Sequence, residues 1–274
     1  MRDSWLVKVK RTTYCFFALN GRIIQLSLFD LRGLILQVVK NREHNRRVQD
    51  IFSSIANRYD LMNRVMTGGQ DVVWRREVIR RAELAPGRKL LDIGTGTGDL
   101  AIEALKQCPD CWVAAVDLTE QMMQIGRKRA QKQWFGHTGL VWGGADGLLL
   151  PFADNEFDAV VSGFLLRNVN DLQICLAEQL RVLKPGGLMV ALDTAPPPVS
   201  VLKPLIMFHL RVVIPTLGRM ASGTQEPYRY LPATTEAFLA PQQVALRMKT
   251  AGFCETAYRS LMGGTVAIYR GRKS

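Results

Sequence analysis

The sequence predicts an α/β fold in which a mostly parallel sheet is covered by helices on both faces. Two observations lead to this expectation. Between residues 90 and 192, short apolar runs alternate with segments whose apolar residues recur at helical spacing, as in strand–helix–strand units. The apolar run Leu90–Ile93 also leads directly into glycine-rich Gly94–Gly98, and Leu100–Leu105 then resumes helical spacing. A strand, a glycine turn and a helix start indicate a ligand-binding turn of such a fold.

The expected core contains five strands with helices between them. The strands are expected at Leu90–Ile93, Trp112–Val116, Leu140–Gly143, Ala159–Ser162 and Leu188–Leu192. The helices are expected at Asp99–Gln107, Glu120–Lys132 and Leu172–Leu183. Lys184–Gly187 is expected to turn the chain into the fifth strand. An antiparallel hairpin of Phe253–Arg259 and Thr265–Arg270 would bring the sheet to seven strands.

The glycine turn predicts a nucleoside ligand. The second strand ends in Asp117, where doubly wound folds place the carboxylate that binds two ribose hydroxyls. The spacing G-x-G-x-G differs from the G-x-G-x-x-G of dinucleotide sites, in which a pyrophosphate lies on a helix N-terminus. Asp92, two residues before the first glycine, would repel a pyrophosphate but suits the cationic amino-acid end of S-adenosylmethionine (SAM). An ordinary glycine turn is the alternative.

Composition and cysteine usage limit the class of protein. With 274 residues, of which 47% are apolar, the chain is long enough for a full core and has the composition of a soluble globular protein. The pair Cys108-Pro-Asp-Cys111 has no second C-x-x-C and too few histidines beside it for a zinc site. We expect a helix-to-strand turn with free thiols, and hence a reducing, cytoplasmic compartment.

The first 45 residues have no clear place in this fold. Residues 1–50 hold ten Lys or Arg against four acids, which favours contact with an anionic membrane surface; no nucleic-acid partner is expected, since no RNA-binding signature or zinc finger accompanies the charge. Ile23–Val39 is apolar, but Asp30, Arg32 and Gly33 interrupt it, so it is unsuited to spanning a bilayer. An amphipathic surface helix, an organellar targeting segment, an artefact of an upstream start and a loosely ordered extension all stay open.

Two further segments flank the expected core. Phe52–Asn63 and Trp74–Ala82 have helical spacing and predict a helical cap over the cofactor. Pro196–Pro198 bar a helix, and the apolar stretch Val199–Met220 follows. This insertion is expected to form a lid that lines an apolar substrate pocket, with ordinary core packing as the alternative. His209, inside it, is expected to be a satisfied core histidine.

Eight segments, in order over Val48–Lys273, resemble one family. They are Phe52–Asn63, Asp92–Asp99, Leu150–Asp158, Leu166–Val169, Arg181–Gly187, Tyr228–Leu231, Ala251–Phe253 and Gly263–Lys273. This set is similar to the ubiquinone/menaquinone-biosynthesis C-methyltransferases, which are class I SAM-dependent methyltransferases; the Y-D-x-M-N, L-R-N-V and Y-R-Y-L segments are the most particular to it. The sequence departs from the family's pattern at Gly163, at Leu165 and at Asp193–Thr194.

The resemblance implies a Rossmann-like class I methyltransferase fold that binds SAM and requires no metal. The cofactor contacts expected from the strand ends and the resemblance together are Asp92, Gly94, Thr95, Gly96, Thr97, Gly98, Asp117, Leu118, Met122, Asp146, Gly147 and Gly163. The expected reaction is C-methylation of a prenylated quinol. O- or N-methylation of another lipid-like molecule and a non-catalytic subunit of a quinone-synthesis complex are the alternatives.

Four residues are candidates for the chemistry. Arg167 is expected to stabilise a developing phenolate rather than the fold, with a surface ion pair as the alternative. Tyr59 and Asp60 are candidate base or orienting groups, with helix capping and packing as the alternative. Asn168 follows Arg167 in the same particular segment.

The expected organisation is an extension followed by one methyltransferase domain. The ranges are 1–45 for the extension, 46–274 for the domain, and within it 48–85 for the cap, 86–193 for the core, 194–239 for the lid and 240–274 for a C-terminal helix and hairpin. A homodimer is one expectation for the assembly. Localisation is expected to be cytoplasmic, peripheral to a membrane through residues 1–45, or organellar if these residues are a transit segment.

Overall fold

The computed structural model describes residues 5–9, 12–19, 22–27, 43–133, 139–199, 203–213, 216 and 226–274. The chain divides into two compact units, residues 1–47 and residues 48–274. Among the helices in this described part, none is long and apolar enough to cross a membrane.

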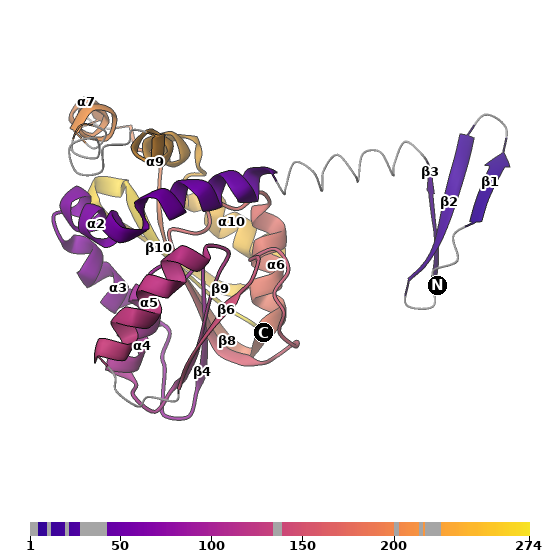
Figure 1. Cartoon of the computed structure of the whole chain (residues 1–274), viewed down its shortest axis with the longest axis horizontal. Helices are drawn as coiled ribbons and strands as arrows, with labels where there is room; N and C mark the ends of the chain where they lie inside the picture. The colour runs from indigo at the N-terminus through magenta and orange to yellow at the C-terminus, as the bar shows by residue number, and fades with distance from the viewer. Residues whose placement is uncertain are drawn as a thin grey trace. The chain divides into compact units, whose positions relative to one another are not determined.

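The first unit contains a three-stranded antiparallel sheet. Its strands β1 (Trp5–Val9), β2 (Thr12–Leu19) and β3 (Arg22–Ser27) pair in sequence order (Figure 1). An amphipathic surface helix was one alternative for Ile23–Val39, and it is wrong for residues 23–27 because they lie in β3. The segments are rich in β-branched and aromatic residues, which favour strands. Residues 28–39 of that expected helix lie outside the described residues.

The second unit is built on a seven-stranded sheet, which confirms the predicted fold class. Its strands are β4 (Lys89–Ile93), β5 (Trp112–Asp117), β6 (Leu140–Gly144), β7 (Phe157–Gly163), β8 (Leu183–Thr194), β9 (Cys254–Leu261) and β10 (Val266–Arg272). Their spatial order is β6-β5-β4-β7-β8-β10-β9. Strands β4 to β8 are parallel, whereas β10 is antiparallel to both β8 and β9.

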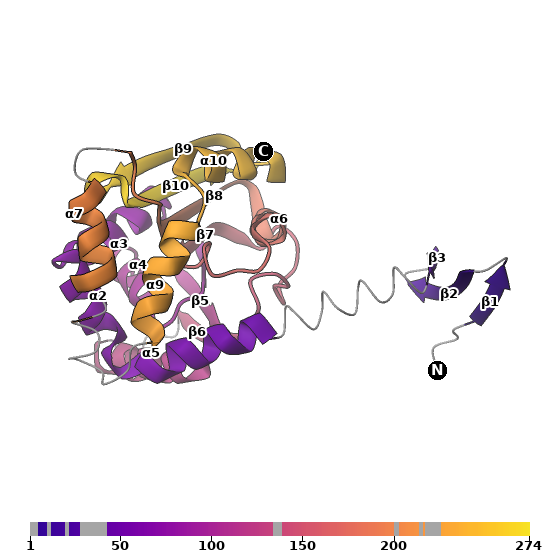
Figure 2. The same cartoon turned by 90° about the horizontal axis from the view of Figure 1, so that it is seen from above.

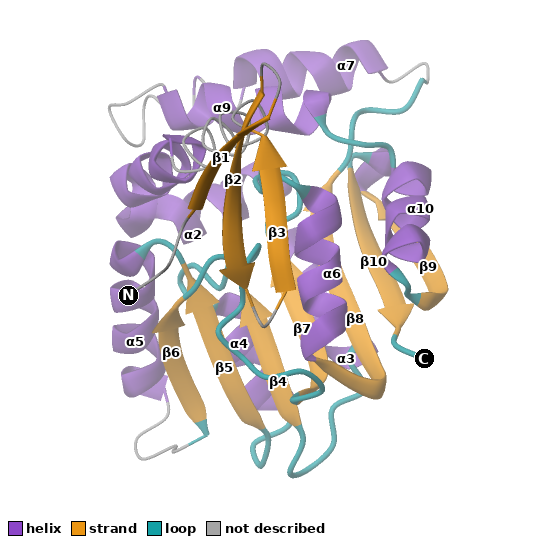
Figure 3. Cartoon of the chain, turned by 90° about the vertical axis from the view of Figure 1, so that its right-hand side faces the viewer, coloured by secondary structure: helices purple, strands orange, loops and turns teal. Residues whose placement is uncertain are grey.

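Helices cover both faces of this sheet because consecutive apolar residues of each strand point to opposite sides. Leu90 packs with α3 (Gln70–Arg81) and α4 (Asp99–Gln107), whereas its neighbour Leu91 packs with α6 (Leu172–Val182) and α10 (Pro241–Ala251). In Figure 3, α6 and α10 lie in front of the sheet and α3 and α4 behind it. The four interior parallel strands, β4, β5, β7 and β8, are thus buried on two sides, as their nearly continuous apolar sequence requires, whereas β6 lies at the edge of the sheet.

The Lys184–Gly187 segment differs from its prediction as a turn before the fifth strand. It lies inside β8, where the register with β7 jumps from the pair Phe157–Leu183 to the pair Ala159–Leu188. Gly186 has φ +79°, a left-handed conformation that suits a bulge and that glycine adopts without strain. The strand therefore begins five residues earlier than expected.

Helices of the cap and of the insertion complete the unit. Residues 48–55 are helical, and η1 (Ala56–Arg58), α2 (Tyr59–Thr67) and α3 follow. The insertion contains α7 (Lys203–Phe208), the π-helical turn η2 (His209–Val213) and α9 (Glu226–Ala237). Figure 3 shows α7 and α9 at the end of the sheet toward which the arrows of the parallel strands point, and Figure 2 shows the same two helices from above. Ligands of open α/β sheets bind at this end.

Candidate active site

The glycine turn joins β4 to α4 in a conformation that other residues tolerate poorly. Gly96 has φ +56° and Gly98 has φ +79°. A Cβ on Gly98 would lie 2.4 Å from the Trp142 ring, so both backbone and space require glycine there. The expected contact Met122 lies below the turn, with its Cε 3.2 Å from where a Cβ on Gly96 would stand.

Asp92 is the most deeply buried acid of the turn. Only 1% of it is exposed, and its Oδ2 accepts hydrogen bonds from the Thr95 hydroxyl at 2.6 Å and the Ala101 amide at 3.1 Å. Its Oδ1 has no partner among the described residues. Burial raises the pKa of Asp92 to about 7. An unpartnered oxygen on a desolvated carboxylate suits a cationic donor, so the site fits the ammonium of SAM.

Asp117 is held at the end of β5 by backbone amides. Its Oδ2 accepts from Gly96 at 2.8 Å and its Oδ1 from Thr119 at 2.7 Å. Burial raises the pKa of this carboxyl as well. Each carboxylate oxygen has more than one lone pair, so both can still accept from vicinal ribose hydroxyls. The assignment of the amino-acid end of SAM to Asp92 and of its ribose to Asp117 stays a prediction.

The other expected cofactor contacts lie around the same edge. Leu118 directly follows Asp117, and its carbonyl accepts from Gln49 Nε2 at 2.8 Å. Asp146 follows β6 and accepts from the Leu148 amide at 2.9 Å, while Gly147 is buried next to it. Gly163 ends β7. The strand ends therefore bring the predicted set together.

Leu165 and Gly163, where the sequence departs from the family's pattern, both border this site. Leu165 Cδ1 lies 3.0 Å from the Cβ position of Gly94, and Leu165 Cδ2 lies 3.9 Å from that of Gly147. The leucine thus fills space between two glycines of the expected cofactor site. A Cβ on Gly163 would lie 3.3 Å from Leu100, so a larger residue there would require Leu100 to shift.

Asp60 ties the cap to the glycine turn. Its Oδ1 accepts from the Thr97 hydroxyl at 2.6 Å, and its Oδ2 pairs with Arg129 at 2.7 Å. Arg129 also pairs with Asp99 at 2.6 Å and donates to the Thr97 carbonyl. Burial and the Asp99 carboxylate raise the pKa of Asp60, against the effects of Thr97 and Arg129. Both carboxylate oxygens of Asp60 are therefore engaged, and they link the cap to the glycine turn. We call these contacts the Asp60 clamp.

A second set of charges continues this clamp into α3. Asp71 is fully buried and pairs with Arg75 and Arg64, and Arg75 also lies 3.2 Å from Asp99 Oδ2. Although burial acts in the other direction, the guanidiniums of Arg75 and Arg129 hold the pKa of Asp99 below its usual range. Sequence reasoning missed Arg75 and Arg129. For Arg75 the signal was the run of basic residues in the expected helix Trp74–Ala82, which is common on solvated surfaces, and Arg129 had no such signal.

Tyr59 lies in the small cavity next to the turn, with Asp92, Arg75 and Gly163 among its neighbours. Burial raises the pKa of Tyr59, and nearby Asn63, Arg167 and Arg75 act in the opposite direction. A phenol with a raised pKa stays protonated at neutral pH. Tyr59 is therefore suited to donate a hydrogen bond and poorly suited to act as a base.

A large apolar pocket of about 510 Å³ lies between the cap, the insertion and the end of the sheet. Its lining residues are Asn63, Met66, Thr67, Trp74, Phe164, Arg167, Thr194, Leu205, Ile206, Phe208, His209, Val213, Pro232, Thr235, Met262, Thr265 and Val266. The insertion thus lines a pocket, as the sequence predicts. Phe164 also lines the cavity of the glycine turn, and of the residues lining the two cavities it is the shared one. Its φ of +62° is rare for an aromatic residue and typical of functional turns.

Arg167 lies in this pocket as a buried ion pair, which differs from the expected alternative of a surface pair. Only 4% of its side chain is exposed; its Nη1 pairs with Asp193 Oδ1 at 2.6 Å, and the Asp193 side chain is fully buried. The guanidinium also lies over the Phe164 ring at 5.3 Å. Its Nε has no partner among the described residues. Asp193, at one of the positions where the sequence departs from the family's pattern, therefore supplies the carboxylate that orients Arg167.

Asn168 connects the loop to the insertion. Its Nδ2 donates to the Phe164 carbonyl at 2.8 Å, and its Oδ1 accepts from the Tyr230 hydroxyl at 3.1 Å. Two of the three segments most particular to the resembled family, L-R-N-V and Y-R-Y-L, thus meet through these side chains. The contacts place Asn168 in the support of the Phe164 turn.

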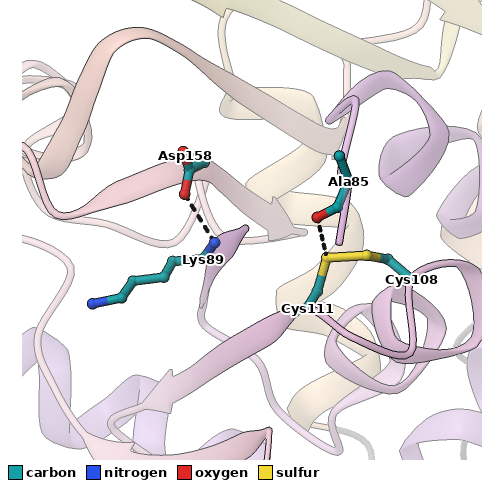
Figure 4. Close-up of a disulfide and its surroundings, with 5 residues drawn as sticks. All are labelled: Ala85, Lys89, Cys108, Cys111 and Asp158. Atoms are coloured by element: carbon teal, nitrogen blue, oxygen red, sulfur yellow. Dashed lines mark hydrogen bonds between the residues drawn. A yellow bond between two sulfur atoms is a disulfide. The ribbon is translucent and has the colours of Figure 1, made fainter. Parts of the chain in front are cut away.

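The expectation of free thiols at Cys108 and Cys111 is wrong. The two form a disulfide in the connection between α4 and β5 (Figure 4). Both are buried, and their Cα atoms are 5.5 Å apart, a usual separation for bonded cysteines. Cys111 Sγ lies 3.1 Å from the Ala85 carbonyl oxygen, where a reduced thiol would donate a hydrogen bond. The argument for a reducing compartment therefore loses its basis.

Comparisons with known proteins match this architecture. Residues 39–273 match the model of the ubiE/COQ5 methyltransferase family. The chain is 42% identical to the ubiquinone/menaquinone biosynthesis C-methyltransferase UbiE of Desulfotalea psychrophila, over 82% of this chain and 90% of that protein. It is 40% identical to the demethylmenaquinone methyltransferase of Thermus thermophilus, over 81% of this chain and 99% of that protein. A crystal structure of a SAM-dependent methyltransferase from Thermotoga maritima has a similar fold, with a TM-score of 0.57 and 21% sequence identity. The match covers 82% of this chain and 99% of that one.

Proposed function

The chain belongs to the ubiE/COQ5 methyltransferase family, and from this premise we propose that it transfers the methyl group of SAM to a ring carbon of a prenylated quinol. It is a SAM-dependent methyltransferase. The single observation that supports this acceptor is the 510 Å³ apolar pocket that shares Phe164 with the cavity of the glycine turn. A pocket of this size and lining suits a hydrophobic ligand with few polar groups.

The residues of the turn would hold SAM, which supplies a methyl group on a sulfonium. Asp92 would accept from its ammonium and Asp117 from its ribose hydroxyls. The Asp60 clamp would close the cap over the turn and exclude water from it. Exclusion of water strengthens the electrostatic contacts in a site and prevents side reactions.

Arg167 would act on the acceptor. A ring carbon becomes more nucleophilic as the ring hydroxyl loses its proton, so a cation next to that oxygen favours the reaction. The Asp193 carboxylate holds the guanidinium through Nη1, and Arg167 is among the residues that line the pocket. Its positive charge would thereby stand at the pocket wall, where it would stabilise a phenolate oxygen.

The test is methylation of a defined acceptor by the purified chain. A short-tailed demethylmenaquinol and a demethylated benzoquinol would be incubated with SAM under anaerobic, reducing conditions, and products identified by mass spectrometry. We expect a methyl group on a ring carbon. A methyl group on oxygen or nitrogen would favour the alternative reactions, and SAM binding without any transfer would favour a non-catalytic subunit. The quinone pool of cells lacking the protein should contain the demethylated species.

Contact of residues 1–45 with an anionic membrane surface belongs to this proposal. Its support is the excess of basic residues in the first fifty positions and the hydrophobic nature of the proposed acceptor. A membrane-bound acceptor and a basic extension on its enzyme would raise their encounter rate.

A further inference from the structure

The small cavity at the glycine turn is lined by charges of both signs. Of the described residues that line it, Asp92 and Asp99 are the acids and Arg75 is the cation. The amino-acid end of SAM carries a carboxylate as well as an ammonium, and an acid can bind only the ammonium. A carboxylate next to two acids is repelled unless a cation also stands close to it. The cavity therefore needs a cationic partner for the second charge of this end.

The guanidinium of Arg75, and not only its apolar stem, borders this cavity. Its Nη1 lies 3.2 Å from Asp99 Oδ2, and its central carbon lies 6.0 Å from the centre of the Phe164 ring. Asp99 and Phe164 both line the cavity. The Arg75 side chain also keeps 8% of its surface exposed. The charged end of the side chain is therefore next to the space that the ligand would fill.

Arg75 still has donors for a ligand. A guanidinium carries five N–H groups in a planar fork. In the described part of the chain, the contacts of Arg75 with Asp71 and with Asp99 both use Nη1. Nε and Nη2 make no hydrogen bond there, yet they are not among its fully enclosed atoms that lack a partner. Both nitrogens therefore keep accessible surface at which a ligand oxygen can bind.

The other side-chain donors of the cavity are already engaged. The Thr95 hydroxyl donates to Asp92 and the Thr97 hydroxyl to Asp60, each at 2.6 Å. The Tyr59 hydroxyl is hydrogen-bonded to a side chain of its own helix, α2. Among the described side chains that line the cavity, Arg75 is thus the one with donors to spare for a ligand carboxylate.

From these contacts we infer that Arg75 binds the carboxylate of SAM through Nε and Nη2. These two nitrogens present parallel N–H groups, which match the two oxygens of a carboxylate. Nη1 stays with Asp71 and Asp99, and these acids fix the direction of the fork. The inference rests on the proposed function only in that it takes SAM to bind with its amino-acid end beside Asp92. It does not depend on the acceptor.

The carboxylate contact predicts that the chain distinguishes SAM from decarboxylated SAM, which keeps the nucleoside, the sulfonium and the ammonium. Calorimetry on the full chain would compare the two ligands. We expect the wild type to bind SAM roughly 10- to 100-fold more tightly, the range for hydrogen bonds between charged groups. Arg75→Met keeps the apolar stem without the fork, so it should bind the two ligands with nearly equal affinity.

Arg129→Met is the matched control. It also removes a cation that pairs with Asp99, at 2.6 Å, but Arg129 is not among the residues that line the cavity. A general weakening of the site should lower the affinities for both ligands by the same factor, so the ratio of the two affinities should stay as in the wild type. A merely structural role of Arg75 would give the same result in Arg75→Met.

Equal affinities of the wild type for the two ligands would overturn the inference, and so would a wild-type ratio in Arg75→Met. If Arg75→Met does not fold because Asp71 loses a counterion, Asp71→Asn is added to it. The ratio is then compared with that of Asp71→Asn alone, and an unchanged ratio again overturns the inference. A chain that binds SAM but methylates no quinol would contradict only the proposed acceptor. A wild-type chain that binds neither ligand would contradict both proposals.

Discussion

Replacement of Arg167 should affect folding and turnover by separate physical routes. The sequence suggests an effect on the transition state alone, but the structure pairs Arg167 with a fully buried Asp193. Arg167→Met keeps the apolar stem and removes the charge, so it leaves the Asp193 carboxylate in the core without its counterion. We therefore expect both the melting temperature and the turnover rate to fall.

The contacts of Asp193 set the size of the stability effect. Breaking a buried ion pair by removing one partner costs about 3–5 kcal/mol. Asp193 keeps hydrogen bonds from the Arg167 amide at 3.2 Å and the Thr194 amide at 2.7 Å, so the lower end, about 3 kcal/mol, applies. For a domain of this size that corresponds to a fall in Tm of roughly 6–12 °C. Loss of one aimed donor should reduce turnover by roughly 10²-fold.

The double variant Arg167→Met with Asp193→Asn separates the two effects. It removes the stranded charge and keeps one of the two oxygens that accept from the backbone amides of Arg167 and Thr194, so part of the lost Tm should return while turnover stays low. Tm would be measured by thermal denaturation, and turnover normalised to the folded fraction. A single variant with unchanged Tm would refute the energetic argument, and a double variant that regains wild-type turnover would refute the role of Arg167 in the reaction.

Three further outcomes follow from the described contacts. Asp117→Ala should weaken SAM binding by about 1–3 kcal/mol in calorimetry, and NAD should not compete; equal affinities would remove Asp117 from the site. Burial raises the pKa of Asp92 to about 7, so the protonated carboxyl stabilises the fold fully below about pH 4, and this stability is lost as the pH rises through 7. Asp92→Asn should therefore increase the free energy of unfolding more at pH 8 than at pH 5 in SAM-free urea titrations. An increase that does not depend on pH would contradict this. Deletion of residues 1–45 should reduce salt-sensitive sedimentation with anionic vesicles and leave SAM binding intact, whereas equal sedimentation would exclude the extension as the contact.

The sheet and the cofactor edge could be predicted because they depend on local patterns. Period-2 and period-3.6 segments alternate along the chain, and parallel strands bring their carboxyl ends to one edge. Asp92 and Asp117 could therefore be assigned to this edge from the predicted ends of their strands alone. The predicted ends of the hairpin strands also agree closely with β9 and β10.

The charge clamp and the pocket wall could not be predicted because they depend on contacts between distant segments. Arg129 reaches Asp60, 69 residues earlier, and a basic residue on an amphipathic helix carries no sign of such a partner. Phe164 looks like an ordinary strand-end residue until its backbone conformation is known. The bulge in β8 could not be predicted for a similar reason. A Pro-Gly-Gly segment favours a turn, and only the register with β7 shows that strand pairing continues on both sides of it.

Phe164, the wall common to the two cavities, has a consequence for how the reactants are exchanged. SAM is supplied from water, whereas a prenylated quinol is supplied from lipid, so an enzyme that joins them has to serve two phases. Phe164 is the described residue that lines both cavities, so in the proposed reaction the donor and the acceptor would occupy separate spaces that border the same side chain. A spent donor could then leave its own cavity while the acceptor stays bound in the other.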